Sequence, residues 1–194
     1  MRQDFFEPGV IYHVFNRGNN KENIFFEEEN YRYFLELLKK HLLPIADIYA
    51  YCLLKNHFHL VIKIKDYDQL EEKYQTKPYL PFSHFFNAYA KAVNKKYNRT
   101  GSLFQKHLHR KRIEDEKYLI QLIVYVHLNP VKHLFTVDYK MYRYSSYQAY
   151  ISGKSSSVER EYVLSLFGDK ENFEYWHDIN VLNFLDDVED VGDL

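Results

Sequence analysis

The sequence of 194 residues contains a single cysteine and no long apolar run. One cysteine, Cys52, excludes an intramolecular disulfide and a zinc site built from several cysteines, so we expect a buried and reduced side chain. No stretch approaches the roughly 18 apolar residues that a transmembrane helix needs, and residues 1–4 do not begin a signal peptide. A soluble protein of the cytoplasm is therefore expected. No internal repeat is present.

Aromatic residues, by contrast, are abundant, with 19 tyrosines and 15 phenylalanines. Most of these rings are expected to pack in a hydrophobic core, because a hydrophobic content of 46% is sufficient for one main domain of this length. Exposed rings would also offer faces on which nucleic-acid bases can stack.

The formal net charge of −1 hides an uneven distribution of charge. Residues 169–194 carry nine acidic side chains and one basic side chain, so the rest of the chain is basic. We expect this acidic segment to be disordered or to cover a basic face. Positions 95–112 contain a basic cluster with no acidic residue, formed by Lys95, Lys96, Arg99, Lys106, Arg110, Lys111 and Arg112. Such a cluster is often only a solvated face, but with interleaved aromatic side chains it is also typical of a phosphate-binding surface.

Hydrophobic periodicity predicts alternating strands and helices. Strands are expected at residues 10–16, 45–54, 57–65 and 103–113, and helices at residues 30–43, 80–97, 116–128 and 158–167. The order of the first seven elements predicts an α+β fold of the ferredoxin-like class, an antiparallel sheet with helices packed on one side. Pro130 is expected to end the third helix. Because residues 153–157 have linker composition, we assign residues 1–150 to the main domain and residues 151–194 to a helical and acidic extension.

The most informative motif is His57-Phe58-His59, which lies in the third predicted strand. Side chains alternate between the two faces of a strand, so both imidazoles point the same way and can bind one metal ion. Ten histidines in this length also produce such pairs by chance. A packed or surface histidine pair is therefore the alternative interpretation.

A polar line on the third predicted helix is the second candidate feature. Gln121, Tyr125 and Asn129 are spaced four apart and share one helix face. Tyr125 could be a boundary residue of an amphipathic helix, and Asn129 could simply cap it. In the functional interpretation, Tyr125 is a nucleophile that attacks a phosphorus atom of DNA, for which a phenol with a pKa near 10 needs activation by a cation. Tyr118 lies on the same face and is the rival nucleophile.

Together the two motifs suggest a divalent metal site. Two histidines leave coordination positions for substrate and for a third protein ligand, for which the amide oxygen of Asn129 is the candidate. Imidazole and oxygen ligands suit Mg²⁺ or Mn²⁺, although imidazole would also accept Zn²⁺ or Ni²⁺. His13 is expected to be a satisfied sheet histidine, and the second pair, His107 and His109, is expected to meet phosphates or solvent.

Several blocks in the expected order resemble the REP-associated tyrosine transposases and related single-tyrosine insertion-sequence transposases of the HUH (His-hydrophobic-His) endonuclease superfamily. The resemblance covers roughly residues 8–150, and its blocks are Pro8-Gly9 to Asn16-Arg17-Gly18, Asn56-His57-Phe58-His59-Leu60, Gly101-Ser102-Leu103-Phe104-Gln105, Tyr118-Leu119, Tyr125-Val126-His127-Leu128-Asn129-Pro130-Val131 and Tyr144-Ser145-Ser146-Tyr147. Residues 1–150 would then be the HUH catalytic domain.

The resemblance implies roles for individual residues. His57 and His59 match the metal-binding pair, Tyr125 matches the nucleophile, and Asn129 falls where related transposases place a Gln or Asn metal ligand. The implied substrate is single-stranded DNA, often hairpin-forming, cleaved through a 5′-phosphotyrosyl intermediate with a free 3′-OH. Arg17 and Asn19 could contact this DNA, although a polar loop is the simpler interpretation.

Some features depart from the family or leave alternatives open. Lys55 stands where these proteins often have proline, and the acidic segment is less basic than a DNA-binding extension should be. Related transposases include homodimers that exchange the tyrosine helix and chains that work alone. The alternatives in function are a non-catalytic nucleic-acid-binding module on a ferredoxin-like sheet, for which an RNP-type motif is absent, and a metal-dependent hydrolase that uses water.

Overall fold

The computed structural model describes residues 6–186, and side chains as far as residue 181. Its centre is a four-stranded sheet in the order β2-β3-β1-β4, in which all neighbouring strands are antiparallel. The strands are β1 (Ile11–Arg17), β2 (Ala46–Leu54), β3 (His57–Ile64) and β4 (His109–Ile113). With its helices, this sheet confirms the predicted α+β fold class.

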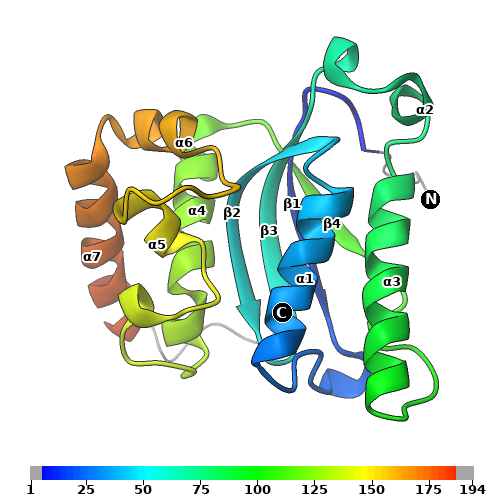
Figure 1. The fold of residues 1–194 in the computed structure, drawn as a ribbon. Coiled ribbons are helices and arrows are strands. Elements are labelled where there is room, and N and C mark those ends of the chain that lie inside the picture. Colours follow the sequence, from blue (N-terminus) through cyan, green and yellow to red (C-terminus); the bar gives the residue numbers. More distant parts are fainter. Residues whose placement is uncertain (1–5, 187–194) are drawn as a thin grey trace.

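Helices cover both faces of the sheet (Figure 1). The helices α1 (Glu28–His41) and α3 (Leu80–Lys96) lie on one side, and α4 (Glu116–Lys132) lies on the other and packs mainly against β2. The prediction that the helices share one side is therefore wrong. The reason lies in β2 and β3, which are buried on both faces over most of their length and so need a cover on each.

The core between the sheet and the α1–α3 layer is aromatic. Phe34 of α1, Phe58 of β3 and Phe85 and Tyr89 of α3 are fully buried, and the Phe34 and Phe58 ring centroids are 5.3 Å apart. Burying each such ring contributes about 1.5–3 kcal/mol. The Tyr89 hydroxyl donates to the Ile24 carbonyl at 2.7 Å, which satisfies its polar end. Much of the aromatic excess in the sequence is thus core packing.

The acidic C-terminal segment forms a packed helix as far as the structure describes it. The helices α5 (Tyr147–Ile151), α6 (Arg160–Phe167) and α7 (Lys170–Asp186) follow α4, and α7 packs against α4. Phe173 and His177 of α7 are fully buried, and Asp178 forms an ion pair with Lys140 at 2.7 Å. Over this part, the expectation of a disordered segment or a cover on the basic face is wrong. Residues 187–194 lie outside the described residues.

Two further element boundaries differ from the prediction. The fourth strand begins at His109, and residues 103–108 before it join the sheet through a bridge between Gly18 and Phe104 and a bond from Asn16 Nδ2 to the Gln105 carbonyl at 3.3 Å. Pro130 lies inside α4, which ends at Lys132, because backbone bonds beyond it persist: the His133 N–H still donates to the Asn129 carbonyl at 3.0 Å. Pro130 therefore removes one donor without ending the helix.

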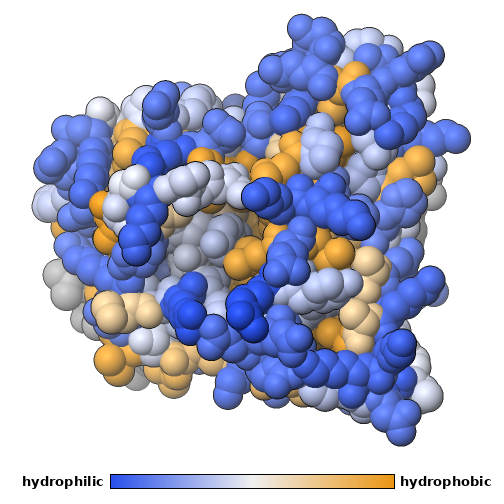
Figure 2. All heavy atoms as spheres, viewed as in Figure 1, coloured by the Kyte–Doolittle hydropathy of each residue, from blue (hydrophilic) through white to orange (hydrophobic). Residues whose placement is uncertain are grey.

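Short elements complete the chain: α2 (Glu72–Gln75) and the 3-10 turns η1 (Asn19–Lys21), η2 (Tyr67–Gln69) and η3 (Tyr139–Met141). Among the described residues, none of the helices has the length and apolarity needed to cross a lipid bilayer. Hydrophilic side chains dominate the face drawn in Figure 2, and hydrophobic side chains appear there only in patches.

Candidate active site

The two histidines of the His57-Phe58-His59 motif lie on the sheet face that α4 covers. Their ring centroids are 5.3 Å apart and the ring planes are nearly perpendicular, at 89°. Phe58 points to the opposite face and packs with α1, as strand alternation requires. Register fixes their neighbours on β1, since His57 pairs with Arg17 and His59 pairs with Phe15.

His59 is held by a second buried histidine. The Nδ1 atom of His59 lies 2.9 Å from Nε2 of His13 on β1, and both side chains are buried. Burial lowers the pKa of His59 well below its usual value and lowers the pKa of His13 to about 4, so both rings are neutral at pH 7. Since this bond occupies Nδ1, the Nε2 atom of His59 is the ring nitrogen that remains for an ion.

His57 lies between two amide oxygens. Its Nδ1 is 2.8 Å from Oδ1 of Asn56, and its Nε2 is 3.2 Å from Oδ1 of Asn129. Burial is the main cause that lowers the His57 pKa to about 4, so the ring carries one N–H at pH 7 and can donate to only one of these oxygens. At the other oxygen, the lone pair of the unprotonated ring nitrogen of His57 faces a lone pair of the amide oxygen.

This arrangement fits a cation. If Nδ1–H donates to Asn56, a metal ion held by Nε2 of His57 and Oδ1 of Asn129 removes the conflict between the lone pairs. Asn129 is fully buried, and its Nδ2 atom has no hydrogen-bond partner among the described residues. An amide rotated by 180° would give Nδ2–H to His57 Nε2 and is the arrangement expected without a metal ion. The residues present therefore suit a site with two imidazoles and one amide oxygen.

The candidate third metal ligand is the amide oxygen of Asn129, whereas protein metal sites are more often built from carboxylate, histidine and cysteine side chains. In the part of the chain that the structure describes, no group of three His, Cys, Asp or Glu side chains could hold a metal. Asn129 lies beside His57 of the histidine pair, and the role of these three residues as metal ligands stays a prediction.

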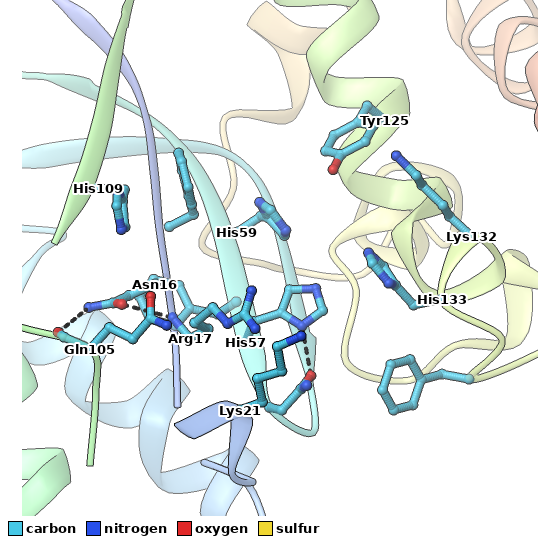
Figure 3. Close-up of a pocket in the computed structure, with 14 residues that line it drawn as sticks. Asn16, Arg17, Lys21, His57, His59, Gln105, His109, Tyr125, Lys132 and His133 are labelled. Carbon is cyan, nitrogen blue, oxygen red and sulfur yellow. Dashed lines mark hydrogen bonds between the residues drawn. The ribbon is translucent and has the colours of Figure 1, made fainter. Parts of the chain in front are cut away.

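Helix α4 brings Tyr125 to the same place. Asp115 caps the start of the helix, since its side chain accepts from the Tyr118 N–H, and Tyr125 and Asn129 follow within the helix, one turn apart. The Tyr125 ring lies 5.8 Å from the His59 ring at 86°, and its hydroxyl points toward the space near His59 and His133 (Figure 3). Burial raises the Tyr125 pKa, and the amide of Asn129 opposes this increase.

A lysine lies against the tyrosine ring. Lys132 Nζ is 4.9 Å from the Tyr125 ring centroid, a cation–π distance, and burial lowers the pKa of Lys132. The rival nucleophile Tyr118 lies outside the cavity described next and accepts a hydrogen bond from Lys111 Nζ at 3.0 Å. Gln121 is exposed, so of the three polar residues in line on α4 the structure brings only Tyr125 and Asn129 to the histidine pair.

A cavity of about 640 Å³ is lined by the histidine pair, Tyr125 and Lys132 (Figure 3). No acidic side chain lines it, whereas three cationic and four histidine side chains do. The lining residues are Phe15, Asn16, Arg17, Lys21, Asn56, His57, Phe58, His59, Gln105, His109, Tyr125, Lys132, His133 and Phe135. Such a lining suits an anionic group in a cavity of ligand size.

Of the residues predicted to bind nucleic acid, Arg17 lines this cavity and Asn19 lies beside it in η1. The basic cluster does not form one surface. Strand alternation sends Arg110 and Arg112 to the face of Tyr12 and Val14, and Lys111 to the face of the site. Lys95 and Lys96 end α3, and Arg99 and Lys106 lie in the connection to β4.

Acidic residues from other parts of the chain neutralise part of this cluster. Lys96 pairs with Glu27 at 2.6 Å and also with Glu29, and Arg99 pairs with Glu22 at 2.6 Å. Arg112 pairs with Glu7 at 3.0 Å and with Glu114 at 2.8 Å, while Arg110 lies over the Phe6 ring. Positions 95–112 contain no acidic residue, but in the folded chain acidic side chains from other segments lie next to several of these basic residues.

Several lining residues were not predicted. Lys132 lies seven residues after Tyr125 on the same face of α4, and His133 follows as the C-cap, with its ring 4.8 Å from the His57 ring. Because the helix was expected to end at Pro130, Lys132 was not expected to share a helix face with Tyr125. Lys21 of η1 and Gln105 reach the cavity from loops, for which sequence periodicity gives no signal.

Comparison with known proteins supports the fold. The structure matches that of a REP-associated tyrosine transposase bound to a REP hairpin, with a TM-score of 0.59 and 14% sequence identity. The match covers 82% of this chain and 96% of that chain. No protein-family model matches the sequence, and neither does any curated protein. At this identity the likeness establishes a shared fold, and it agrees with the family resemblance noted in the sequence.

Proposed function

We propose that this protein is a metal-dependent, single-tyrosine DNA transposase that cleaves and rejoins single-stranded DNA through a 5′-phosphotyrosyl intermediate. The observation that carries the proposal is the convergence of Tyr125 with His57 and His59 in one cavity, with 5.8 Å between the Tyr125 and His59 rings. The similar structure is a transposase bound to a REP hairpin, which supports hairpin-forming single-stranded DNA as the substrate here.

In the proposed reaction the Tyr125 oxygen is the nucleophile. After the phenol loses its proton, the oxygen attacks the scissile phosphorus, a phosphotyrosyl ester forms and the bond from phosphorus to the 3′ oxygen breaks. The departing 3′ oxygen takes up a proton and becomes a free 3′-OH. In rejoining, a 3′-OH attacks the same phosphorus and returns the proton to tyrosine. The ester conserves the energy of the broken bond, so no external energy source is needed.

The chain offers three ligands for a divalent cation, Mg²⁺ or Mn²⁺: Nε2 of His57, Nε2 of His59 and Oδ1 of Asn129. When bound, such an ion supplies Lewis-acid polarisation of the scissile phosphate and stabilises charge on the leaving oxygen. The bonds from Asn56 and His13 orient the two imidazoles. Hydrogen bonds of this kind fix the tautomer of a ligating histidine and raise its affinity for metal.

Lys132 would assist Tyr125. Burial raises the Tyr125 pKa, so the phenol is a poor nucleophile without a compensating charge. The Lys132 ammonium, 4.9 Å from the ring centroid, favours the phenolate by Coulomb attraction. The two residues lie about two turns apart on α4, so the helix sets their relative position.

The remaining assignments follow from this reaction. Arg17 and Asn19 are proposed to contact DNA at the cavity, and Lys111 is the residue of the central basic run that shares its face. Lys95, Lys96, Arg99, Lys106, Arg110 and Arg112 are proposed to contact DNA further from the cavity, where three of them must share their charge with acidic partners. Residues 1–150 are the proposed catalytic domain. Because one chain supplies both the histidine pair and Tyr125, a homodimer is not required to complete the site.

A covalent adduct assay tests the proposal. A labelled single-stranded oligonucleotide that contains the hairpin is incubated with protein and Mn²⁺ or Mg²⁺, and a denaturing gel is examined for a protein–DNA adduct. We expect the adduct with the native chain and its loss in Tyr125→Phe. Tyr118→Phe is the matched control, because it removes a phenol of the same helix outside the cavity, and it should retain the adduct.

Other outcomes would point to the alternatives. Cleavage that persists in Tyr125→Phe would contradict the tyrosine mechanism and favour a hydrolase that uses water. Binding of the oligonucleotide without cleavage by the native chain would favour a non-catalytic module. An adduct that disappears in Tyr118→Phe and persists in Tyr125→Phe would reverse the assignment of the nucleophile.

A further inference from the structure

Three aromatic rings form a row across the sheet beside the histidine pair. His59 on β3, Phe15 on β1 and His109 on β4 are direct cross-strand neighbours on one face. The Phe15 ring lies 5.8 Å from the His59 ring at 26°, and 5.1 Å from the His109 ring at 12°. We call these three residues the aromatic row. It starts at one predicted metal ligand and ends at the edge of the sheet.

The outer part of the aromatic row is accessible. Helix α4 packs mainly on β2, at the opposite edge of the sheet, so it leaves β1 and β4 less covered on this face. Phe15 is half-buried and His109 is exposed, and both line the cavity that contains Tyr125. The rings of His59 and His109 lie on either side of Phe15, so the open ring face of the row is the outer face of His109, on the edge strand β4.

The charge around the aromatic row indicates what occupies it. Arg17, Lys21 and Lys132 line the same cavity, and no acidic side chain does. A planar apolar group attached to an anion matches such a surface, and a nucleotide of a single strand has this composition. In proteins that bind single strands, bases stack on aromatic side chains while cationic side chains follow the phosphates.

We propose that the outer face of His109, with Phe15 packed behind it, forms a base-stacking subsite for one nucleotide that flanks the scissile phosphate. The inference rests on the proposed function, because it takes the phosphate position from His57, His59 and Tyr125. Along the sheet from the histidine pair, His109 is the first ring with an open face, two strands away from His59. Stacking on this face would help to hold the phosphate in line with the tyrosine and would tolerate any base, since every base has a π-face.

Binding measurements with abasic oligonucleotides test the subsite. Affinity for a labelled hairpin oligonucleotide with single-stranded flanks is measured by fluorescence anisotropy in the Tyr125→Phe background, so that cleavage does not interfere. A series of oligonucleotides carries one abasic site at each flanking position in turn. We expect one position at which the missing base weakens binding by about 5- to 100-fold.

Variants of the aromatic row then identify what that base contacts. His109→Leu should weaken binding of the intact oligonucleotide by a similar factor and should lose no more at the abasic position, because the two changes remove the same contact. His109→Phe keeps a ring and should recover most of the affinity. Tyr67→Leu is the control, since Tyr67 is an exposed aromatic residue outside the cavity. Phe15→Leu removes the ring behind His109 and should show a smaller loss at the same position.

Salt dependence separates stacking from phosphate contact. His109→Leu should leave the slope of log affinity against log salt unchanged, whereas Arg17→Gln should reduce it by about one. If His109→Leu binds as tightly as the parent chain, or weakens binding equally for intact and abasic oligonucleotides, the subsite is wrong. If no covalent adduct forms but one abasic position still weakens binding, the proposed cleavage reaction is wrong and the base-stacking subsite stands. If the chain binds no single-stranded oligonucleotide, the cleavage reaction and the subsite are both wrong.

Discussion

His13 Nε2 and His59 Nδ1 lie 2.9 Å apart in a buried contact between two adjacent strands. The sequence predicted that His13 would be satisfied within the sheet, and this contact gives it a partner. Both rings are neutral, so the bond needs one N–H and one lone pair. If His59 binds an ion through Nε2, its Nδ1 carries the proton and donates to His13. His13 would then set the tautomer of a metal ligand without touching the metal.

We therefore predict that His13→Phe weakens metal binding by about 10- to 100-fold, because phenylalanine cannot accept the proton of His59 Nδ1. Mn²⁺ binding at fixed pH, followed by electron paramagnetic resonance of the free ion, measures this change. His13→Gln retains an acceptor and should lose less. His107→Phe removes an exposed histidine outside the cavity and should bind Mn²⁺ as the native chain does. Equal affinities for His13→Phe and His107→Phe would refute the positioning role.

Asn129 gives a second prediction for the metal site. Asn129→Ala removes the amide oxygen that lies 3.2 Å from His57 Nε2, so Mn²⁺ affinity should decrease at least about tenfold. Asn129→Asp keeps an oxygen at the same place and adds a negative charge, and it should bind Mn²⁺ at least as tightly as the native chain. The same titration measures both variants. An unchanged Mn²⁺ titration curve for Asn129→Ala would remove this residue from the ligand set.

Local sequence patterns predicted most of the central fold. Strand alternation predicted that His57 and His59 share one face of β3, and helical spacing predicted that Tyr125 and Asn129 share one face of α4. The structure brings the two pairs together. Both predictions depend on near neighbours along the chain, whose geometry is fixed by the period of the element. The metal, nucleophile and DNA-binding roles stay predictions, as does the domain boundary at residue 150.

The missed features depend on contacts between distant segments. No local signal says that α4 crosses to the face opposite α1, that Glu22 and Glu27 neutralise Arg99 and Lys96, or that His13 meets His59 across β1 and β3. The helix after Asp169 was also hidden, because its acidic composition resembles that of a disordered segment. Its burial depends on a few apolar positions, such as Phe173, that pack against the rest of the core.

Gly18 gives a prediction for stability. A Cβ atom at this position would lie 1.9 Å from the Glu22 carbonyl oxygen, so Gly18→Ala forces η1 to move. We expect the free energy of unfolding to decrease by about 1–3 kcal/mol, the usual cost of overpacking. Urea denaturation measures it. Gly101→Ala is the control: Gly101 has a positive φ of 85° but no atom within 4 Å of an added Cβ, so only backbone strain of about 1–2 kcal/mol applies. If Gly18→Ala is as stable as the native chain, the η1 loop tolerates displacement.

A directed chain of hydrogen bonds ties α7 to the sheet. His177 Nδ1–H donates to the Phe173 carbonyl at 2.7 Å, so its Nε2 accepts from Nδ1–H of His127 at 2.8 Å. His127 Nε2 then accepts from the Ser146 hydroxyl at 2.7 Å, and the Tyr51 N–H donates to that hydroxyl at 2.8 Å. Every ring nitrogen in this chain has a defined role only while both histidines are neutral.

This chain predicts that stability falls at acidic pH. Burial is the main cause that lowers the His177 pKa to about 4, against an ordinary value near 6.5 in the unfolded chain, although Asp178 opposes the decrease. The unfolded state therefore binds more protons between these values, and the contribution is fully present above pH 6.5 and is lost as the pH falls toward 4. The groups facing His177 are His127 of α4, Tyr139 and Lys140 of η3, Tyr147 of α5 and Asp178 of its own helix.

From pH 7.5 to pH 5, protonation of the unfolded state alone should reduce the free energy of unfolding by about 2 kcal/mol through His177. Urea denaturation at both pH values measures the decrease for the native chain. His177→Gln keeps a polar partner for His127 but does not titrate, so its decrease over the same interval should be smaller by this amount. His13, His57 and His59 contribute equally to both proteins, and burial, the main cause of the low pKa of His127, is present in both. If the free energy of unfolding decreases equally in the two proteins, His177 is protonated in the folded state as easily as in the unfolded chain. The chain of hydrogen bonds from Phe173 to Ser146 through neutral histidines is then wrong.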